Sequence, residues 1–224
     1  MTAGFRIRTQ WDRLERSIVE DFAQLPVSVV SDVMSRLVAG GAALRPMHRN
    51  GVLAGAALTV KTRPGDNLMI HKAIEMAEPG DVIVVDAGGD LTNSLMGELM
   101  LTHAIKRGVA GFVLNGAIRD AAAFLERNLP VYALGATHRG PYRDGPGEIG
   151  LPINIGGMTV EPGDLMLGDF DGVVCVARAD LETVLAGARK KHAAEQLQME
   201  QTESGSVDKS WIDKVLVEKG CVYL

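Results

Sequence analysis

Between residues 56 and 135 the chain alternates short apolar runs with segments of helical periodicity, and this alternation limits the fold more than any other feature. The apolar runs are AALTVKT, DVIVVDAGG, VAGFVLNGAIRD and PVYALG, and the segments between them are DNLMIHKAIEMAEPG, SLMGELMLTHAIKRG and AAAFLERN. Strands that alternate with helices in this way usually pair in parallel. The sequence therefore predicts an α/β core with some parallel pairing.

The segments on either side of this core have a different character. Helical spacing of apolar residues predicts helices over residues 10–25 and 26–37 before the core. After it, a Gly- and Pro-rich loop at 138–152 leads into short apolar runs broken by GG, PGD and DFDG, which is typical of antiparallel or barrel-like strands. A long amphipathic helix and a shorter one are predicted over residues 180–201 and 206–220.

The chain has no low-complexity linker and no internal repeat. We expect one domain over residues 1–224, with a core at about 25–180 and a C-terminal helical arm at about 180–224. Helical arms at both ends suggest packing against a neighbouring subunit.

Composition, charge and cysteine content limit what kinds of molecule the protein can bind and in which compartment we expect it. Hydrophobic residues make up 46% and charged residues 23% of the 224 residues, enough to bury a substantial core. A formal charge of −5 argues against a nucleic-acid-binding face. No apolar run approaches the roughly 20 residues of a membrane span, and the start lacks the pattern of a secretory signal. Cys175 and Cys221 have no metal or disulfide motif around them, so we predict a reduced, cytoplasmic protein.

Most catalytic motifs are missing from the sequence. There is no GxxxxGK[ST] or GxGxxG loop between a strand and a helix, which also argues against a methyltransferase, and no HExxH, CxxC or nucleophile elbow. The two glycines of DAGGD are a weak signal for anion binding. The five histidines are scattered, and isolated histidines are more often packed or solvated than functional. They are His48, His71, His103, His138 and His192.

The adjacent pair Arg119 and Asp120 stands where a predicted strand ends and a helix begins. Taken locally, Asp120 is a good N-cap for the helix that follows and Arg119 is a solvated neighbour. A second acidic residue, Glu98, follows the preceding strand and its loop. Because the carboxyl ends of parallel strands share one crevice, neighbouring strands would bring all three together.

Two carboxylates and a guanidinium in one crevice suggest specific chemistry. Carboxylate oxygens suit Mg²⁺ or Mn²⁺ better than zinc. The planar fork of an arginine suits a bound carboxylate or oxyanion. The sequence therefore suggests a site for a small keto acid.

The chain has Glu98, then a gap of twenty residues, then Arg119-Asp120. This pattern resembles the acidic-X20-Arg-Asp signature of the class II pyruvate aldolases. These aldolases cleave 4-hydroxy-4-methyl-2-oxoglutarate and 4-carboxy-4-hydroxy-2-oxoadipate, and share their fold with the regulator of ribonuclease activity A. The resemblance extends over roughly residues 25–200 and includes the segments GELMLTHAIKRGVAGFVLNGAIRD and INIGGMTVEPGDLMLGDFDGVVCV. It implies a compact α/β mixed-sheet sandwich of the ribonuclease-regulator-A type with N- and C-terminal helical arms, assembled as a homotrimer or homohexamer.

The resemblance also implies roles for individual residues. Asp120 would be the direct ligand of a divalent metal, Mg²⁺ or Mn²⁺, and Glu98 would hold a metal-bound water. Arg119 would bind the keto oxygen of the substrate and stabilise the enolate that forms when the C–C bond breaks.

The substrate's C1 carboxylate would lie at the start of the predicted helix at 98–107. The backbone amides after Gly97, chiefly those of Leu99 and Met100, would receive it, because exposed N–H groups and the helix dipole favour an anion there.

The family completes its site with an acidic residue from the C-terminal helix of a neighbouring subunit. Glu195, Glu200 and Glu203 lie in the corresponding segment, and spacing favours Glu195. A solvated helix face accounts for each of them equally well.

The chain departs from the family pattern at two positions. Asn115 stands where relatives often have Asp, and Glu98 where the aldolases commonly have Asp. Asn115 lies beside the signature and not within it. At position 98, a water-mediated contact can accommodate the extra methylene of the glutamate side chain.

The implied reaction is a metal-dependent retro-aldol cleavage that releases pyruvate, with oxaloacetate decarboxylation as a side activity. Two alternatives stay open: a non-catalytic regulator that binds and inhibits a ribonuclease complex, and an enzyme of sugar-acid or aromatic catabolism that uses the same enolate chemistry.

Overall fold

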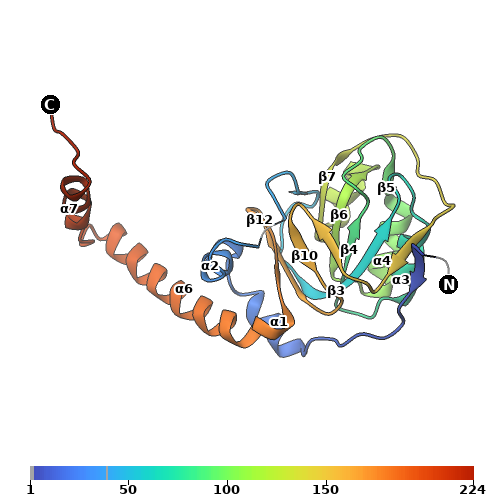
Figure 1. Ribbon diagram of the computed structural model, residues 1–224, viewed down its shortest axis with the longest axis horizontal. Coiled ribbons are helices and arrows are strands. Elements are labelled where there is room, and N and C mark those ends of the chain that lie inside the picture. Colours follow the sequence, from blue (N-terminus) through green and yellow to red (C-terminus); the bar gives the residue numbers. More distant parts are fainter. Residues whose placement is uncertain (1–2, 39) are drawn as a thin grey trace.

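A mixed ten-stranded sheet forms the centre of the computed structural model, which describes residues 3–38 and 40–224 (Figure 1). Its main path runs in the order β1-β8-β3-β4-β6-β7-β2. These strands span Phe5–Ile7, Gly147–Ile149, Leu53–Thr62, Asp81–Asp86, Gly111–Ile118, Val131–Ala136 and Arg45–Pro46. Strands β3, β4, β6 and β7 pair in parallel, which confirms the predicted α/β core.

The two middle strands of this core are apolar on both faces. Residues 82–85 of β4, the run VIVV, are all fully buried, and so are residues 112–114 of β6. Parallel strands covered on both sides favour such continuous β-branched runs over an alternating pattern.

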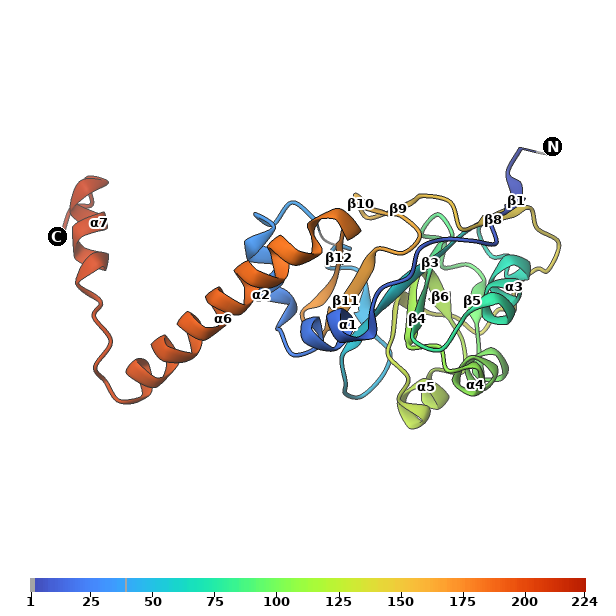
Figure 2. The same ribbon diagram turned by 90° about the horizontal axis from the view of Figure 1, so that it is seen from below.

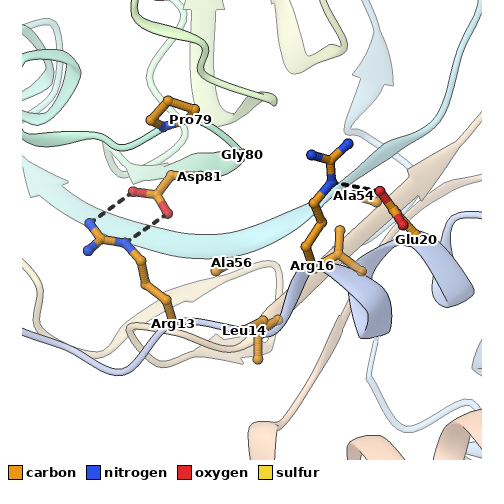
Figure 3. Close-up of a pocket in the computed structure, with 10 residues that line it drawn as sticks. Arg13, Leu14, Arg16, Glu20, Ala54, Ala56, Pro79, Gly80 and Asp81 are labelled. Carbon is orange, nitrogen blue, oxygen red and sulfur yellow. Dashed lines mark hydrogen bonds and ion pairs between the residues drawn. The ribbon is translucent and has the colours of Figure 1, made fainter.

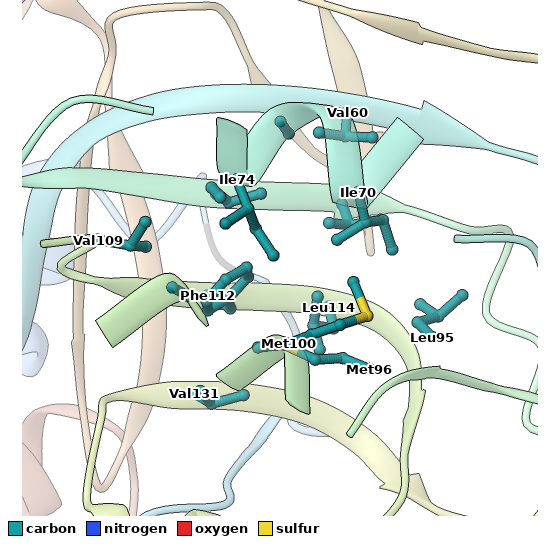
Figure 4. Close-up of a cluster of buried hydrophobic side chains, with 14 of the residues drawn as sticks. Val60, Ile70, Ile74, Leu95, Met96, Met100, Val109, Phe112, Leu114 and Val131 are labelled. Atoms are coloured by element: carbon teal, nitrogen blue, oxygen red, sulfur yellow. The ribbon is translucent and has the colours of Figure 1, made fainter. Parts of the chain in front are cut away.

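Helices α3 (Leu68–Met76), α4 (Glu98–Arg107) and α5 (Ala121–Arg127) lie on one face of the sheet. Figure 4 shows the cluster they bury, in which Ile70 and Ile74 of α3 lie with Phe112 and Leu114 of β6. Burying side chains of this size contributes about 1.5–3 kcal/mol each.

The other face is covered by further strands, and two helices pack with the start of α6 outside them. Strand β11 (Leu165–Asp169) pairs antiparallel with both β3 and β12 (Gly172–Val176), and β9 (Ile153–Ile155) pairs antiparallel with β10 (Met158–Val160). This confirms the antiparallel pairing predicted for the part of the chain after the Gly- and Pro-rich loop. Helices α1 (Arg16–Phe22) and α2 (Val27–Val33) pack with the start of α6 against β11 and β12.

Three predicted elements differ in the structure. The helix expected over 10–25 is limited to α1, because Arg13 lies in extended chain and pairs with Glu78 (2.7 Å) and Asp81 (3.4 Å). Residues 94–96, expected as helix, form β5 (Ser94–Met96), which pairs in parallel with β6 and is fully covered. The loop expected at 138–152 contributes β8 to the sheet.

A helical arm follows the last strand, as predicted. A short 3₁₀ turn (Arg178–Asp180) leads into α6 (Leu181–Glu203), which projects from the body and carries α7 (Ser210–Glu218) at its far end (Figures 1 and 2). Leu197, Met199, Trp211 and Val217 expose 55–69% of their surface there. Among residues 3–38 and 40–224, no helix combines the length and apolar character needed to cross a membrane.

Candidate active site

Three parallel strands end side by side at the carboxyl edge of the sheet. Met96 of β5 pairs with Ile118 of β6, and Ile118 pairs with Ala136 of β7. The Arg119 N–H donates to the Met96 carbonyl (2.9 Å), and the Thr137 N–H donates to the Ile118 carbonyl (2.8 Å). The residues that follow each strand therefore lie together, which is where ligands bind in sheets of this kind.

Asp120 links the end of β6 to the start of α4. Its Oδ2 accepts a hydrogen bond from the backbone N–H of Glu98 at 3.0 Å, so its carboxylate caps α4. Helix α5, which follows Asp120, is capped only by the backbone of Asp120, whose carbonyl accepts from the Ala123 N–H at 2.9 Å. The side chain of Asp120 makes no capping hydrogen bond to α5. The local N-cap interpretation is thus right for the backbone of Asp120 and wrong for its side chain.

The backbone of Asp120 is in the left-handed region, at φ 58° and ψ 41°. This conformation costs an L residue about 1–2 kcal/mol, although aspartate and asparagine tolerate it best. Such conformations are concentrated at functional sites, where the surrounding structure enforces them. Here the conformation places the carboxylate against α4.

Gly97, the residue before α4, leaves space that both functional side chains occupy. A Cβ at this position would lie 2.6 Å from Asp120 Oδ2 and 3.0 Å from both Cγ and Nε of Arg119. The backbone of Gly97 is extended and fits any residue. The glycine is therefore required by close packing of Arg119 and Asp120.

Arg119 and Asp120 open onto one pocket of about 350 Å³, which Ala136, Thr137 and His138 complete. Arg119 Nε lies 3.7 Å from Asp120 Oδ2, and the two side chains are 38% and 46% exposed. Both groups are therefore within reach of a ligand.

The first turn of α4 contributes backbone N–H groups to the same region. The Glu98 N–H is occupied by Asp120, and the Leu101 N–H bonds to the Gly97 carbonyl at 3.0 Å. The N–H groups of Leu99 and Met100 have no backbone acceptor within the part of the chain that the structure describes. Free amides in the first turn of a helix attract an anion.

Two carboxylates near α4 provide oxygen donors for a hard cation. Asp120 bonds to the Glu98 N–H through Oδ2, and within residues 3–38 and 40–224 its Oδ1 has no partner. In the same residues, the exposed Glu98 side chain has no ion-pair partner. In the same described residues, no three His, Cys, Asp or Glu side chains are grouped to hold a metal. Of the two carboxylates, that of Asp120 lines the pocket. A carboxylate oxygen of this kind fits Mg²⁺ or Mn²⁺, ions that keep several waters or substrate oxygens as ligands.

The structure does not bring Glu195 to this pocket. Glu195 lies on α6, where it pairs with Lys191 at 2.8 Å, on the arm that projects from the body (Figure 1). Glu200 and Glu203 lie further along the same exposed arm. Within one chain, none of the three is placed with Asp120.

Asn115 makes a specific contact with an acidic neighbour. Its Nδ2 donates to Asp86 Oδ1 at 3.1 Å, and its carbonyl accepts from the Gly89 N–H at 3.1 Å. An aspartate at 115 would place a second carboxylate against Asp86. The amide therefore suits this chain, and it fixes the DAGGD loop to the end of β6.

A different pocket lies at the opposite edge, where β3 and β4 begin (Figure 3). Arg13 crosses it and is held by Asp81, and Leu14, Ala54 and Ala56 line it. Since Arg119 follows the carboxyl end of β6, the two pockets lie at opposite ends of the parallel strands. Both oxygens of Asp81 accept from Arg13, and Glu20 pairs with Arg16. At the other site, Asp120 Oδ1 has no partner among the described residues.

His138 also lines this pocket, although in the sequence it is one of five scattered histidines. It stands just after β7 as Arg119 stands just after β6. That shared position after a predicted parallel strand is the signal that would have identified it.

Comparison with known proteins agrees with this architecture. A family model described as "RraA-like: Aldolase/RraA" matches residues 27–175. A protein of Halalkalibacterium halodurans, named "Putative 4-hydroxy-4-methyl-2-oxoglutarate aldolase", is 40% identical over 179 residues, 80% of this chain and 85% of that protein.

Solved structures show the same fold. The Streptomyces coelicolor RraAS2, titled as an unusual member of the RNase ES inhibitor RraA protein family, superposes with a TM-score of 0.77 at 24% identity, covering 84% of this chain and 98% of its own. The Thermus RNA-processing inhibitor RraA gives a TM-score of 0.63 at 30% identity, covering 67% and 92%. The predicted ribonuclease-regulator-A type of mixed-sheet fold is confirmed, and the chain belongs to the RraA-like family, which includes aldolases and RraA proteins.

Proposed function

We propose that the chain is a divalent-metal-dependent lyase that cleaves 4-hydroxy-2-oxo dicarboxylic acids of the 4-hydroxy-4-methyl-2-oxoglutarate type to pyruvate. One observation carries the proposal: Arg119 and Asp120 line one solvent-open pocket, and the Asp120 carboxylate also accepts a hydrogen bond from the first turn of α4. The name of the 40% identical relative supports the same reaction class.

The pocket suits a 2-oxo acid in one orientation. The free N–H groups of Leu99 and Met100 would receive the C1 carboxylate. Arg119 would then donate to the C2 oxygen, and Asp120 with Glu98 would hold the cation. A bound Mg²⁺ or Mn²⁺ would supply Lewis acidity toward the keto group.

Cleavage needs charge to be stabilised at the C2 oxygen. The C4 hydroxyl loses its proton, the C3–C4 bond breaks, and its electron pair forms the enolate of pyruvate while C4 becomes a carbonyl. A proton added at C3 completes pyruvate, so the overall reaction is balanced. The preorganised Arg119 guanidinium would stabilise the enolate oxygen, a contribution typically worth about 3–4 kcal/mol to the barrier.

Oxaloacetate would pass through the same enolate. Loss of CO₂ from its C4 leaves the electron pair on C3, and protonation again gives pyruvate. We therefore propose oxaloacetate decarboxylation as a side activity of the same residues.

A regulatory function is the second candidate. The observation in its favour is the 30% identity to a structure titled as an RNA-processing inhibitor. Metal-dependent pyruvate release that Asp120→Ala abolishes would support the lyase, whereas inhibition of a ribonuclease complex without pyruvate release would support the regulator.

The direct experiment is a pyruvate-release assay coupled to lactate dehydrogenase. 4-Hydroxy-4-methyl-2-oxoglutarate and oxaloacetate are supplied with Mg²⁺, with Mn²⁺ or with chelator, to the wild type and to Asp120→Ala. Metal-dependent release above the enzyme-free rate, which divalent metals alone raise for oxaloacetate, is expected for the wild type and not for Asp120→Ala. Failure of the wild type to release pyruvate from either substrate, together with inhibition of a ribonuclease complex, would favour the regulator.

We also propose that the protein works as a homo-oligomer, a trimer or a hexamer, in which Glu195 of one copy completes the site of another. The exposed apolar residues of the arm support assembly. Mixing inactive Asp120→Ala with Glu195→Gln chains tests the shared site. Regained activity in the mixed oligomer is expected, and additive low activities would speak against it.

A further inference from the structure

His138 faces the pocket of Arg119 and Asp120 but has no role in holding the fold together. Its side chain makes no hydrogen bond or ion pair with residues 3–38 and 40–224, and it is exposed. An imidazole in a pocket with a guanidinium, free of structural partners, is available to a ligand.

The backbone on both sides of His138 is fixed. Before it, the Thr137 N–H donates to the Ile118 carbonyl at 2.8 Å. After it, the Arg139 carbonyl accepts from both the N–H and the Oγ of Ser94, each at 2.9 Å, and Ser94 is fully buried. The backbone that carries His138 at the edge of the pocket is therefore held in place on both sides.

The same segment also stays close to Arg119. A Cβ added to Gly140 would lie 3.4 Å from Arg119 Nη1, so the guanidinium reaches along the segment that carries His138. The pocket continues from Arg119 and Asp120 to Ala136, Thr137 and His138. With C1 at α4 and the C2 oxygen at Arg119, the distal end of a bound keto acid would extend toward this segment.

We propose that His138 is the specificity-determining residue that binds the distal carboxylate of the substrate, the C5 carboxylate of a 4-hydroxy-2-oxo dicarboxylate. This inference rests on the proposed function, which places C1 at α4 and the C2 oxygen at Arg119. The imidazole N–H donates to the carboxylate. The chain thereby selects dicarboxylates over keto acids with an apolar distal end.

Two ligands that cannot be cleaved test this separately from turnover. 2-Oxoglutarate and 2-oxopentanoate have the same chain length, lack the C4 hydroxyl, and differ in the distal carboxylate. Their dissociation constants are measured by calorimetry with Mg²⁺ for the wild type, His138→Ala and Arg139→Gln. Kinetic measurements with 4-hydroxy-4-methyl-2-oxoglutarate and 4-hydroxy-2-oxopentanoate follow for the same proteins.

In His138→Ala, binding of 2-oxoglutarate is expected to weaken about tenfold or more, the usual effect of losing a hydrogen bond to a charged group. Binding of 2-oxopentanoate should change less than about twofold, and kcat/KM should fall selectively for the dicarboxylate. Arg139→Gln removes an adjacent exposed cation whose side chain does not line the pocket, and should leave the preference intact.

Equal losses for both ligands, no loss for either, or the same selective loss in Arg139→Gln would overturn the assignment of His138. Absence of 2-oxoglutarate binding to the wild type would overturn it as well. Pyruvate release by the wild type tests the lyase function independently. A selective binding loss in a protein without turnover would therefore retain His138 and reject the lyase.

Discussion

The carboxylate of Asp120 accepts a hydrogen bond from the backbone N–H of Glu98 at 3.0 Å, across twenty-two positions of sequence. One oxygen of Asp120 thus fixes the start of α4, while the other has no partner in the part of the chain that the structure describes. Structural and functional roles of this side chain can be separated by changing its charge without removing the acceptor.

Asp120→Asn keeps an oxygen acceptor for the Glu98 N–H and removes the negative charge. The free energy of unfolding is expected to fall by about 1 kcal/mol or less, while the affinity for Mg²⁺ falls more than about tenfold and pyruvate release is lost. Thermal unfolding, metal titration and the coupled assay measure the three quantities. A variant with normal metal affinity would remove Asp120 from the metal site.

Arg119→Lys retains a positive charge but cannot make the two-pronged contact of a guanidinium. We expect kcat to fall about 100-fold or more, because the interaction is strongest with the enolate. Since the side chain is 38% exposed, stability should change by less than about 0.5 kcal/mol. Steady-state kinetics decide this, and a change confined to KM would contradict the role in stabilising the enolate.

Gly97→Ala places a Cβ 2.6 Å from Asp120 Oδ2, so that Asp120 and Arg119 must both move. A loss of about 1–3 kcal/mol in stability and a fall of about tenfold or more in kcat are expected. Gly135→Ala is the matched control, because the nearest atom to its Cβ is 3.8 Å away. Equal behaviour of the two variants would show that Gly97 is not required by packing.

Asn115→Asp should lower the free energy of unfolding by about 1 kcal/mol at pH 7, because it sets a second carboxylate against Asp86. The double change Asp86→Asn with Asn115→Asp exchanges donor and acceptor and should regain most of the loss. Chemical denaturation of the single and double variants measures the coupling. Additive losses would mean that the contact contributes nothing.

The buried Asp66 predicts a dependence of stability on pH. Burial raises the pKa of its carboxyl, but N–H groups of Leu68, Asp144 and Gly145 donate to it and outweigh that effect. The folded-state pKa is therefore below the ordinary value of about 3.9. The stabilisation is complete above that unfolded-state value and is lost as the pH falls through the lower folded-state value.

Asp66→Asn should accordingly cost about 2 kcal/mol at pH 7, and its difference from the wild type should shrink as the pH falls below about 4. Denaturant unfolding between pH 7 and pH 3 measures both proteins. A difference that stays constant over this range would show that the charge of Asp66 does not contribute.

Local patterns were sufficient for most elements of the core. The strand β4 was predictable because its continuous apolar run lies in a few adjacent residues. The end of α4 was predictable because Gly108 follows the helix directly and adopts the left-handed backbone, φ 76°, that glycine favours. The first part of 94–108 was misassigned as helix, because the pairing of β5 with β6 depends on a strand that follows it in the chain.

The sequence by itself determined the α/β alternation, the spacing of Glu98 from Arg119-Asp120 and the chemistry that these residues offer. Tertiary structure alone decided which groups they meet. It directed the carboxylate of Asp120 to cap α4 instead of α5 and reserved the space at Gly97 for two side chains. It also placed His138 in one pocket with Arg119 and kept Glu195 away from the site within one chain. The physical reason is that composition and periodicity act between near neighbours, whereas hydrogen bonds and close contacts across parallel strands join residues that only the assembled sheet brings together.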